Sequence, residues 1–284
     1  MQENRPKTPS DVKRKLRQHA NFGCCRCGLP IYQYHHIIPF SQEQHFRVED
    51  MMVLCPGCHD MATKSVLTEA QQREMQASPF NLRRGLAAGM LHTNQNYCAV
   101  LAGGNILVGE GPMIVANREP LLQLTPGASG HVSLSLTLYS EVGELLGLIV
   151  DNEWLSGDVS VWDMESDHQR LVIRSKANKV ALNLNMKGEP AHLRAKLWHS
   201  GHLIDLRGTG IRVNGKNTHQ NIAHAGFVGM VLELDTTIPR LRMVPQLENA
   251  AIVSDPDPLT RLNQAIAVWK RLKRESSGSA AKQS

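Results

Sequence analysis

The sequence predicts an α+β protein with a small cysteine-rich N-terminal module, an antiparallel β-rich domain of sandwich or barrel type, and a C-terminal helix. Five of the six cysteines lie between Cys24 and Cys58, which indicates a compact module organised around those side chains. Segments in which apolar and polar residues alternate fill much of 97–250, as in strands with one buried face. After Pro258, apolar residues recur at helical spacing.

Changes in composition divide the chain into five consecutive segments. Two helical patterns follow the cysteine-rich module, at 68–77 and 81–92, and Thr68 can cap the first of them. The final residues are rich in Ser, Gly, Ala and Lys, a composition typical of disorder. We therefore expect the module at 1–65, a helical connector at 66–96, the β-rich domain at 97–250, an amphipathic helix at 251–275 and a disordered tail at 276–284.

The β-rich domain contains several clear strand patterns separated by Gly, Asn, Asp and Ser clusters. These patterns lie at 131–139, 158–164, 168–175, 179–186, 192–199, 202–208 and 229–235. Short strands at such intervals are typical of antiparallel sandwiches and barrels. The alternation indicates one buried face and leaves the role of the other face open.

The composition argues against a membrane protein. Of the 284 residues, 42% are apolar, and the strongest apolar runs, such as 145–150, are too short to cross a bilayer. The N-terminal segment is polar and basic and lacks the apolar stretch of a secretory signal. We expect a cytoplasmic protein with no membrane partner. In the cytoplasm, clustered cysteines bind metal more often than they form disulfides.

The net charge of +5 is concentrated at the two ends of the chain. Basic ends favour contact with a polyanion such as DNA, although charged ends can also serve only solubility. The predicted helix at 11–20 carries four basic residues that we take as candidates for phosphate contacts, with a solvated helix face as the alternative. These residues are Lys13, Arg14, Lys15 and Arg17.

The cysteines form two pairs with the spacing of metal-binding knuckles. Cys24 and Cys27 make one CxxC pair, and Cys55 and Cys58 make the other. Four thiolates complete a closed tetrahedral shell, which is typical of structural zinc. Cys25 is left outside this set, because pairing it with Cys27 would give the poorer CxC spacing.

Three histidines accompany the cysteines. His35 and His36 are adjacent in a predicted strand, so a regular strand would direct their side chains to opposite faces. His59 directly follows Cys58. A zinc that gathers the four cysteines would therefore also bring His59 toward the strand that carries the other two histidines.

Together these motifs resemble an HNH endonuclease of the zinc-containing ββα-metal type. The residues that carry the resemblance are Cys24-x-x-Cys27, His35-His36-Ile37-Ile38-Pro39 and Leu54-Cys55-x-x-Cys58-His59. The resemblance covers roughly 10–65, and the β-rich remainder resembles no family that we recognise. The resemblance of the N-terminal motifs implies a metal-dependent DNA endonuclease that hydrolyses phosphodiester bonds with a histidine-activated water.

The resemblance also implies a role for each histidine. His36 would be the general base, as an imidazole can be near neutral pH. His35 and His59 would be ligands of a catalytic divalent ion, Mg²⁺ or Mn²⁺, with Ni²⁺, Co²⁺ or Zn²⁺ also compatible with histidine. Asp50 stands where the family usually has Asn. A carboxylate there can orient the base through its Nδ1–H, and the alternative is a decayed site.

Two functions of different classes follow. The first is a DNA endonuclease of restriction, phage defence or a mobile element, in which the β-rich domain recognises DNA, binds a small-molecule or protein regulator, or forms a homo-oligomer. The second is a zinc-stabilised DNA- or ligand-binding protein without catalysis. Substitution of His36 separates them.

Overall fold

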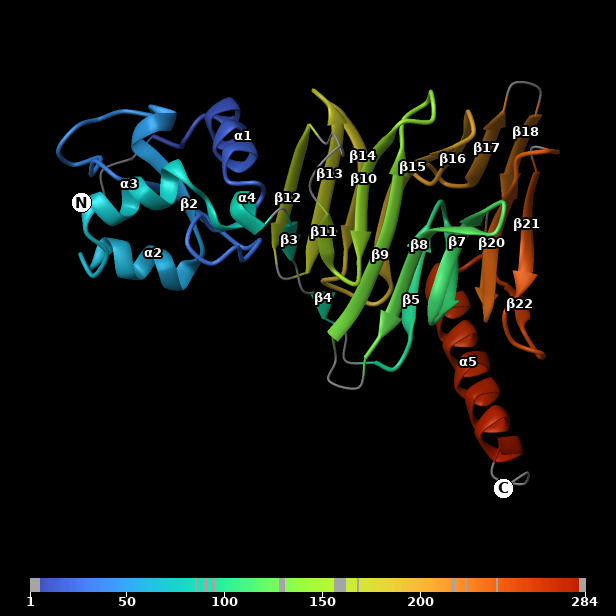
Figure 1. Ribbon diagram of the computed structural model, residues 1–284. Helices are drawn as coiled ribbons and strands as arrows, with labels where there is room; N and C mark the ends of the chain where they lie inside the picture. Colours follow the sequence, from blue (N-terminus) through green and yellow to red (C-terminus); the bar gives the residue numbers. More distant parts are fainter. Residues whose placement is uncertain are drawn as a thin grey trace.

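The structure is a computed structural model of the 284-residue chain. It describes residues 6–84, 86–88, 91–92, 95–127, 131–155, 162–167, 169–215, 218–222, 224–238 and 240–280. Figure 1 shows the N-terminal helices gathered at one end of a large β-rich body, with the C-terminal helix along another side of it. This arrangement confirms the predicted α+β class.

The N-terminal module has the predicted ββα order. Its elements are α1 (Ser10–His19), β1 (Gln33–His36), the short 3-10 helix η1 (Val48–Asp50), β2 (Met51–Leu54) and α2 (Pro56–Thr63). β1 and β2 pair antiparallel, with His36 opposite Met51. Cys55 caps the N-terminus of α2, and Pro56 occupies the first helical turn, where its missing N–H costs nothing. The second cysteine pair is therefore built into the start of this helix.

The connector is helical only in its first part. α3 (Glu69–Ala77) begins at a capping box formed by Thr68 and Gln71, and α4 (Phe80–Arg84) follows. The helical prediction for 81–92 was wrong beyond Arg84, because β3 (Leu86–Ala88) and β4 (Leu91–His92) are strands. They pair with strands of a large sheet, so tertiary pairing overrides their helical pattern.

Two large sheets form the β-rich body. The nine-stranded sheet contains β3, β4, β7 (Gly111–Ala116), β8 (Glu119–Pro126), β9 (His131–Tyr139), β10 (Leu145–Val150), β11 (Glu153–Leu155), β20 (Met230–Asp235) and β21 (Arg240–Pro245). The eleven-stranded sheet contains β5 (Cys98–Ala102), β6 (Asn105–Gly109), β12 (Asp163–Asp167), β13 (Arg170–Lys176), β14 (Lys179–Asn185), β15 (Ala191–His199), β16 (His202–Asp205), β17 (Ile211–Gly215), β18 (Thr218–Ile222), β19 (Ala225–Val228) and β22 (Ala251–Ser254).

The two sheets enclose one apolar core, so of the predicted sandwich or barrel the structure has the sandwich. Leu122 and Leu136 from the nine-stranded sheet and Leu182 and Leu193 from the other sheet belong to the same buried cluster. The prediction of a purely antiparallel domain was wrong, because three strand pairs are parallel. β15 pairs parallel with β5, β19 with β6, and β20 with β7. The predicted strand at 158–164 lies partly outside the described residues, and its described end enters β12.

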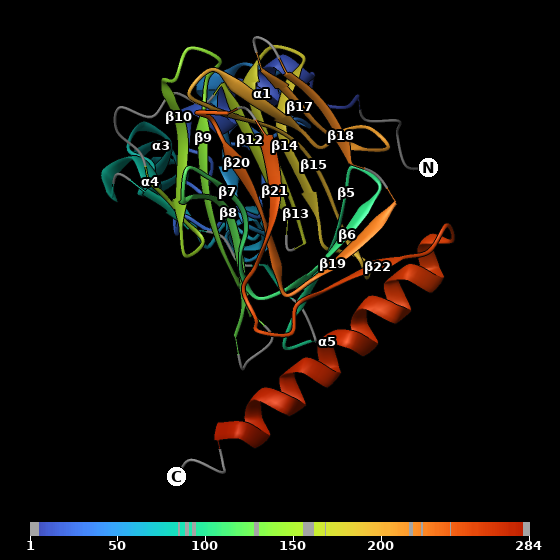
Figure 2. The same ribbon diagram turned by 90° about the vertical axis from the view of Figure 1, so that its right-hand side faces the viewer.

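The C-terminal helix begins later and ends later than predicted. α5 (Pro258–Ala280) starts at the proline, residues 251–254 form β22, and the described part of the expected tail, 276–280, is helical. Its apolar stripe, which includes Leu262, Ala265 and Trp269, is buried against β6, β19 and β22. Figure 2 shows the helix crossing these strands and extending beyond them. None of the described helices is both long and apolar enough to cross a membrane.

A buried ion-pair network joins the N-terminal module to the sandwich. Arg17 of α1 donates from Nε and Nη2 to the Asp163 carboxylate of β12, at 2.9 and 2.6 Å. Nη1 of the same guanidinium donates to the Tyr34 hydroxyl of β1 at 2.5 Å. Arg174 adds ion pairs to Asp163 and to Glu165. The strand that carries the two adjacent histidines is thus tied to the edge of the eleven-stranded sheet.

Candidate active site and metal centre

The four paired cysteines form a metal-binding group, as predicted. The Sγ atoms of Cys24, Cys27, Cys55 and Cys58 all lie within 4.8 Å of one another. The Cys27 Sγ is 3.7 Å from the Cys55 Sγ and 3.9 Å from the Cys58 Sγ. Ligands of a tetrahedral zinc at about 2.3 Å from the ion lie about 3.8 Å apart. The thiol spacing therefore fits structural zinc.

Local backbone structure brings the two pairs together. The Cys24 carbonyl accepts from the Gly28 N–H at 2.8 Å, and Gly28 has a φ of 78°, in the left-handed region. A Cβ at Gly28 would lie 2.2 Å from the Asn81 side chain, so this turn requires glycine. The Cys25 N–H donates to the Val53 carbonyl of β2 at 2.8 Å, which attaches the first pair to the strand leading to the second.

The two remaining cysteines lie outside the metal-binding group. Cys25 is buried in the core of the N-terminal module, and Cys98 is buried in the sandwich core. Burial raises the pKa of each thiol to about 12. Protonated, buried thiols behave as small apolar side chains.

The three predicted histidines line one cavity of about 1180 Å³. The rings of His35 and His59 meet edge to face with their centroids 5.0 Å apart. The His36 side chain, on the next residue of β1, also lines the cavity and is largely buried. The loop after β1, including Pro39 and Phe40, and residues of α2 and α3 also line the cavity. His35 and His59 thus form a pair, with His36 beside them.

His36 is held by a loop that the sequence pattern does not single out. Its Nε2 is 3.0 Å from the His45 carbonyl oxygen, and its ring packs on Phe40, His45 and Phe46. Because a carbonyl can only accept, Nε2 carries the proton, and Nδ1 is the basic nitrogen of the neutral ring. The ring therefore has a fixed orientation and a fixed tautomer.

His45 is a residue next to the candidate site that the sequence analysis missed. Its side chain is buried, and its Nε2 donates to the Ile38 carbonyl at 3.2 Å while its Nδ1 accepts from the Arg47 N–H at 3.3 Å. These bonds fold the loop so that the His45 carbonyl faces His36. In the sequence, His45 is only a histidine in a connecting loop. Such residues are mostly solvated, so the sequence alone does not predict these contacts.

Asp50 has different partners from those predicted. Arg47 donates from Nε to one carboxylate oxygen at 2.6 Å, and both terminal nitrogens of Arg73 donate to the other at 3.2 Å. The hydrogen bond from Arg47, aided by Arg73, holds the pKa of Asp50 below its usual range. Asp50 was predicted to accept a hydrogen bond from the His36 ring; in the structure the His45 carbonyl accepts one from that ring, and Asp50 joins the loop to α3 through Arg47 and Arg73.

The basic residues of α1 have different environments. The prediction that Arg17 contacts phosphate was wrong, because its side chain is only 6% exposed and is paired with Asp163. Arg14 lies over the Trp162 ring at 4.5 Å, and Lys13 lies over the Tyr34 ring at 5.4 Å. Lys15 is exposed. Lys13, Arg14 and Lys15 remain the candidates for contacts with a polyanion.

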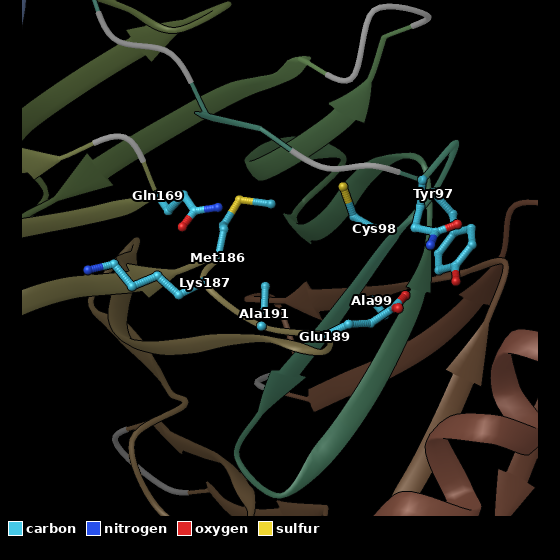
Figure 3. Close-up of a pocket in the computed structure, with 10 residues that line it drawn as sticks. Tyr97, Cys98, Ala99, Gln169, Met186, Lys187, Glu189 and Ala191 are labelled. Carbon is cyan, nitrogen blue, oxygen red and sulfur yellow. The ribbon is translucent and has the colours of Figure 1, made fainter.

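A second, smaller cavity lies at one end of the eleven-stranded sheet. Its volume is about 260 Å³, and Figure 3 shows Gln169 and Lys187 at one end of it and Tyr97 at the other. Burial and a hydrogen bond to Glu189 raise the pKa of the Tyr97 hydroxyl. The cavity combines an ammonium, a carboxylate and amide groups, which is a lining suited to a small polar molecule.

The comparisons with known proteins bear on the N-terminal module alone. Residues 24–65 match the family model described as HNH endonuclease, which confirms the predicted resemblance for that segment. The match includes all four metal-binding cysteines, the three histidines of the cavity and Asp50. No curated protein matches the chain, and no solved structure does.

Proposed function

We propose that the protein is a metal-dependent DNA endonuclease whose active centre is the cavity between β1, α2 and α3. One observation carries the proposal. His35, His36 and His59 line a single cavity within the segment that matches the HNH endonuclease model, beside four thiols spaced for zinc. A zinc-binding module without catalytic function would need only the thiols.

The proposed reaction is hydrolysis of a phosphodiester bond. A water oxygen attacks phosphorus while one proton of the water passes to Nδ1 of His36, and the bond to the 3′ oxygen breaks, after which that oxygen takes a proton from solvent to become a hydroxyl. The His45 carbonyl then accepts from Nε2–H of the resulting imidazolium, an interaction that favours the charged ring. His36 is thus a general base with a built-in partner for its protonated form.

Each metal would have a separate task. Zinc held by Cys24, Cys27, Cys55 and Cys58 would fix the relative positions of β2 and α2 and so of His59. His35 and His59 supply two nitrogen ligands for a catalytic divalent ion, Mg²⁺ or Mn²⁺, with Ni²⁺ as an alternative suited to imidazole. Such an ion stabilises the negative charge that develops on the phosphate and on the leaving oxygen.

The β-rich body is proposed to supply recognition or control. A small nuclease module that acts on the phosphate backbone takes little information from the bases. The cavity lined by Tyr97, Lys187 and Glu189 offers a place for a small polar regulator. Joined to a nuclease, such a domain favours restriction or phage defence over a mobile-element role, in a cytoplasmic enzyme that acts alone or as a homo-oligomer.

The decisive experiment compares cleavage by the wild-type protein with cleavage by His36→Ala. Supercoiled, linear and single-stranded DNA would each be incubated with Mg²⁺, Mn²⁺, Ni²⁺ or EDTA. His192→Ala, a change of an exposed histidine on β15, is the matched control. We expect metal-dependent cutting by the wild type and by His192→Ala, and a loss of about 100-fold or more in His36→Ala.

The alternative function is a zinc-stabilised DNA- or ligand-binding protein without catalysis. It would be supported if none of the substrates were cut under any metal condition while the protein still bound DNA. Cutting that is unchanged in His36→Ala would also contradict the proposed role of this residue, even if the protein were a nuclease. Zinc content measured on each sample shows that the module is intact.

A further inference from the structure

Gln72 places a side chain from outside the family-matched segment against the proposed active centre. Gln72 belongs to α3 and lies seven residues after the end of the matched segment at residue 65. It is buried, with 6% of its surface exposed. Its Oε1 is 2.9 Å from Nε2 of His35, and its Nε2 donates to the Leu67 carbonyl at 2.9 Å. The amide thus uses both of its ends.

These two contacts fix the proton on His35. If the Gln72 amide were turned over, its Oε1 would face the Leu67 carbonyl oxygen, and two acceptors would meet without a proton between them. The amide oxygen therefore faces His35 and can only accept. His35 must donate from Nε2, and its lone pair in the neutral ring is on Nδ1.

We propose that Gln72 is a positioning residue that holds His35 as the Nε2–H tautomer, so that Nδ1 is the atom offered to a divalent ion. This inference rests on the proposed function of His35 as a metal ligand. When one nitrogen of a histidine binds a metal, a neighbouring group that accepts a hydrogen bond from the other nitrogen fixes the ring orientation and raises the basicity of the ligand nitrogen.

The surroundings of Gln72 hold it in place. The capping box of α3 pairs the Thr68 hydroxyl with the Gln71 N–H and the Gln71 side chain with the Thr68 N–H. On the next residue, Arg73 is paired with Asp50, which precedes β2. The capping box thus fixes the first turn of α3, and the Arg73–Asp50 pair ties that helix to the N-terminal module beside Gln72, as a positioning residue requires.

The test uses two substitutions with opposite expected effects. Gln72→Met keeps the length of the side chain and removes the acceptor, whereas Gln72→Glu keeps an acceptor for His35. Mn²⁺ binding to the zinc-loaded protein would be measured by calorimetry, because Mn²⁺ prefers oxygen and nitrogen ligands and does not compete for the thiolates. We expect Gln72→Met to weaken Mn²⁺ binding about 10- to 100-fold and Gln72→Glu to retain or tighten it.

A side chain that only fills space would give the reverse order. In that case Gln72→Met would bind Mn²⁺ like the wild type, and Gln72→Glu, which buries a charge next to the Leu67 carbonyl, would bind it more weakly. That order would overturn the inference. Zinc content and melting temperature of each variant separate a loss of the Mn²⁺ site from a loss of folding.

A second measurement reads the tautomer without any divalent ion or DNA. Long-range ¹H–¹⁵N spectra of the protein labelled in histidine nitrogen distinguish Nδ1–H from Nε2–H, and His35→Gln identifies the signals of His35. We expect Nε2–H in the wild type and a mixture of tautomers in Gln72→Met. Nδ1–H in the wild type would refute the inference.

The outcomes also separate this inference from the proposed function. If His35 of the wild type has the Nε2–H tautomer but the protein does not bind Mn²⁺, the proposal of a metal-dependent nuclease is contradicted. The purpose assigned to Gln72 then fails with it. Mn²⁺ binding that is lost in His35→Gln but unaffected in Gln72→Met would leave the nuclease intact and remove Gln72 from its active centre.

Discussion

Asp50 is the residue at which the chain departs from the HNH pattern, and its contacts indicate what the carboxylate does there. It accepts from Arg47 at 2.6 Å and from Arg73 at 3.2 Å. Because His36 is oriented by the His45 carbonyl, we expect Asp50→Asn to lower the melting temperature but to leave the pH profile of cleavage unchanged. A displaced pH optimum in this variant would instead show that Asp50 acts on the base.

The pH dependence of this stabilisation has a definite sign. The hydrogen bond from Arg47 depresses the pKa of Asp50 in the folded state. The contribution is therefore complete above the unfolded-state pKa of about 3.9 and is lost only as the pH falls through the lower folded-state value. Thermal melts of wild type and Asp50→Asn should differ by the same amount at every pH between about 5 and about 8. A difference that shrank within this range would contradict the assignment.

Residues whose roles depend on sequence spacing could be predicted, and residues whose roles depend on the folded backbone could not. The CxxC pairs place two thiols on one ion through a local turn, so Cys24, Cys27, Cys55 and Cys58 were identifiable. The contacts of His36 with the His45 carbonyl and of His35 with Gln72 of α3 form only when separate parts of the backbone fold together. For the same reason the burial of Arg17 was not visible in the helix pattern.

At the scale of elements, the contact between α1 and β12 joins the N-terminal module to the sandwich. The Arg17 and Asp163 side chains are 6% and 3% exposed. Removal of one partner from a buried pair leaves the other charge uncompensated, at a cost of about 3 kcal/mol. We expect Asp163→Ala to destabilise the protein by this order in denaturant unfolding, reduced to the extent that Glu165 retains Arg17.

The double variant Arg17→Met/Asp163→Ala separates pairing from packing. Because neither charge remains buried alone, its loss of stability should be smaller than the sum of the two single losses. Strict additivity would mean that the pair contributes no coupling. Lys15→Ala is the matched control on the same helix, since Lys15 is exposed, and it should leave stability unchanged.

The element predictions succeeded where a pattern is decided by local burial. The alternation at 131–139 became β9, in which the burial alternates along the whole strand. The helical pattern at 81–92 failed because Leu86–Ala88 pairs with β11, a contact between distant parts of the chain. The parallel pairs of β5, β6 and β7 likewise join strands far apart in sequence, so no local pattern predicts them.

At the scale of the whole molecule, the N-terminal module and the sandwich each have a buried cluster, and only the cluster of the module contains paired cysteines. The core of the N-terminal module includes Leu16, Met51 and Leu54 together with three of the metal-binding cysteines. A module of about 60 residues is near the lower limit for independent stability, so a metal bound at its thiols would contribute directly to folding. The sandwich core contains none of these thiols.

Two cysteine substitutions test this division in calorimetry. Cys27→Ser removes a proposed zinc ligand and should abolish bound zinc, lower the melting temperature of the module and leave the sandwich transition in place. Cys98→Ser puts a hydroxyl into the sandwich core and should keep the zinc while lowering the sandwich transition. If Cys27→Ser instead lowered a single transition of the entire protein, the Arg17–Asp163 contact would couple the two parts into one cooperative unit.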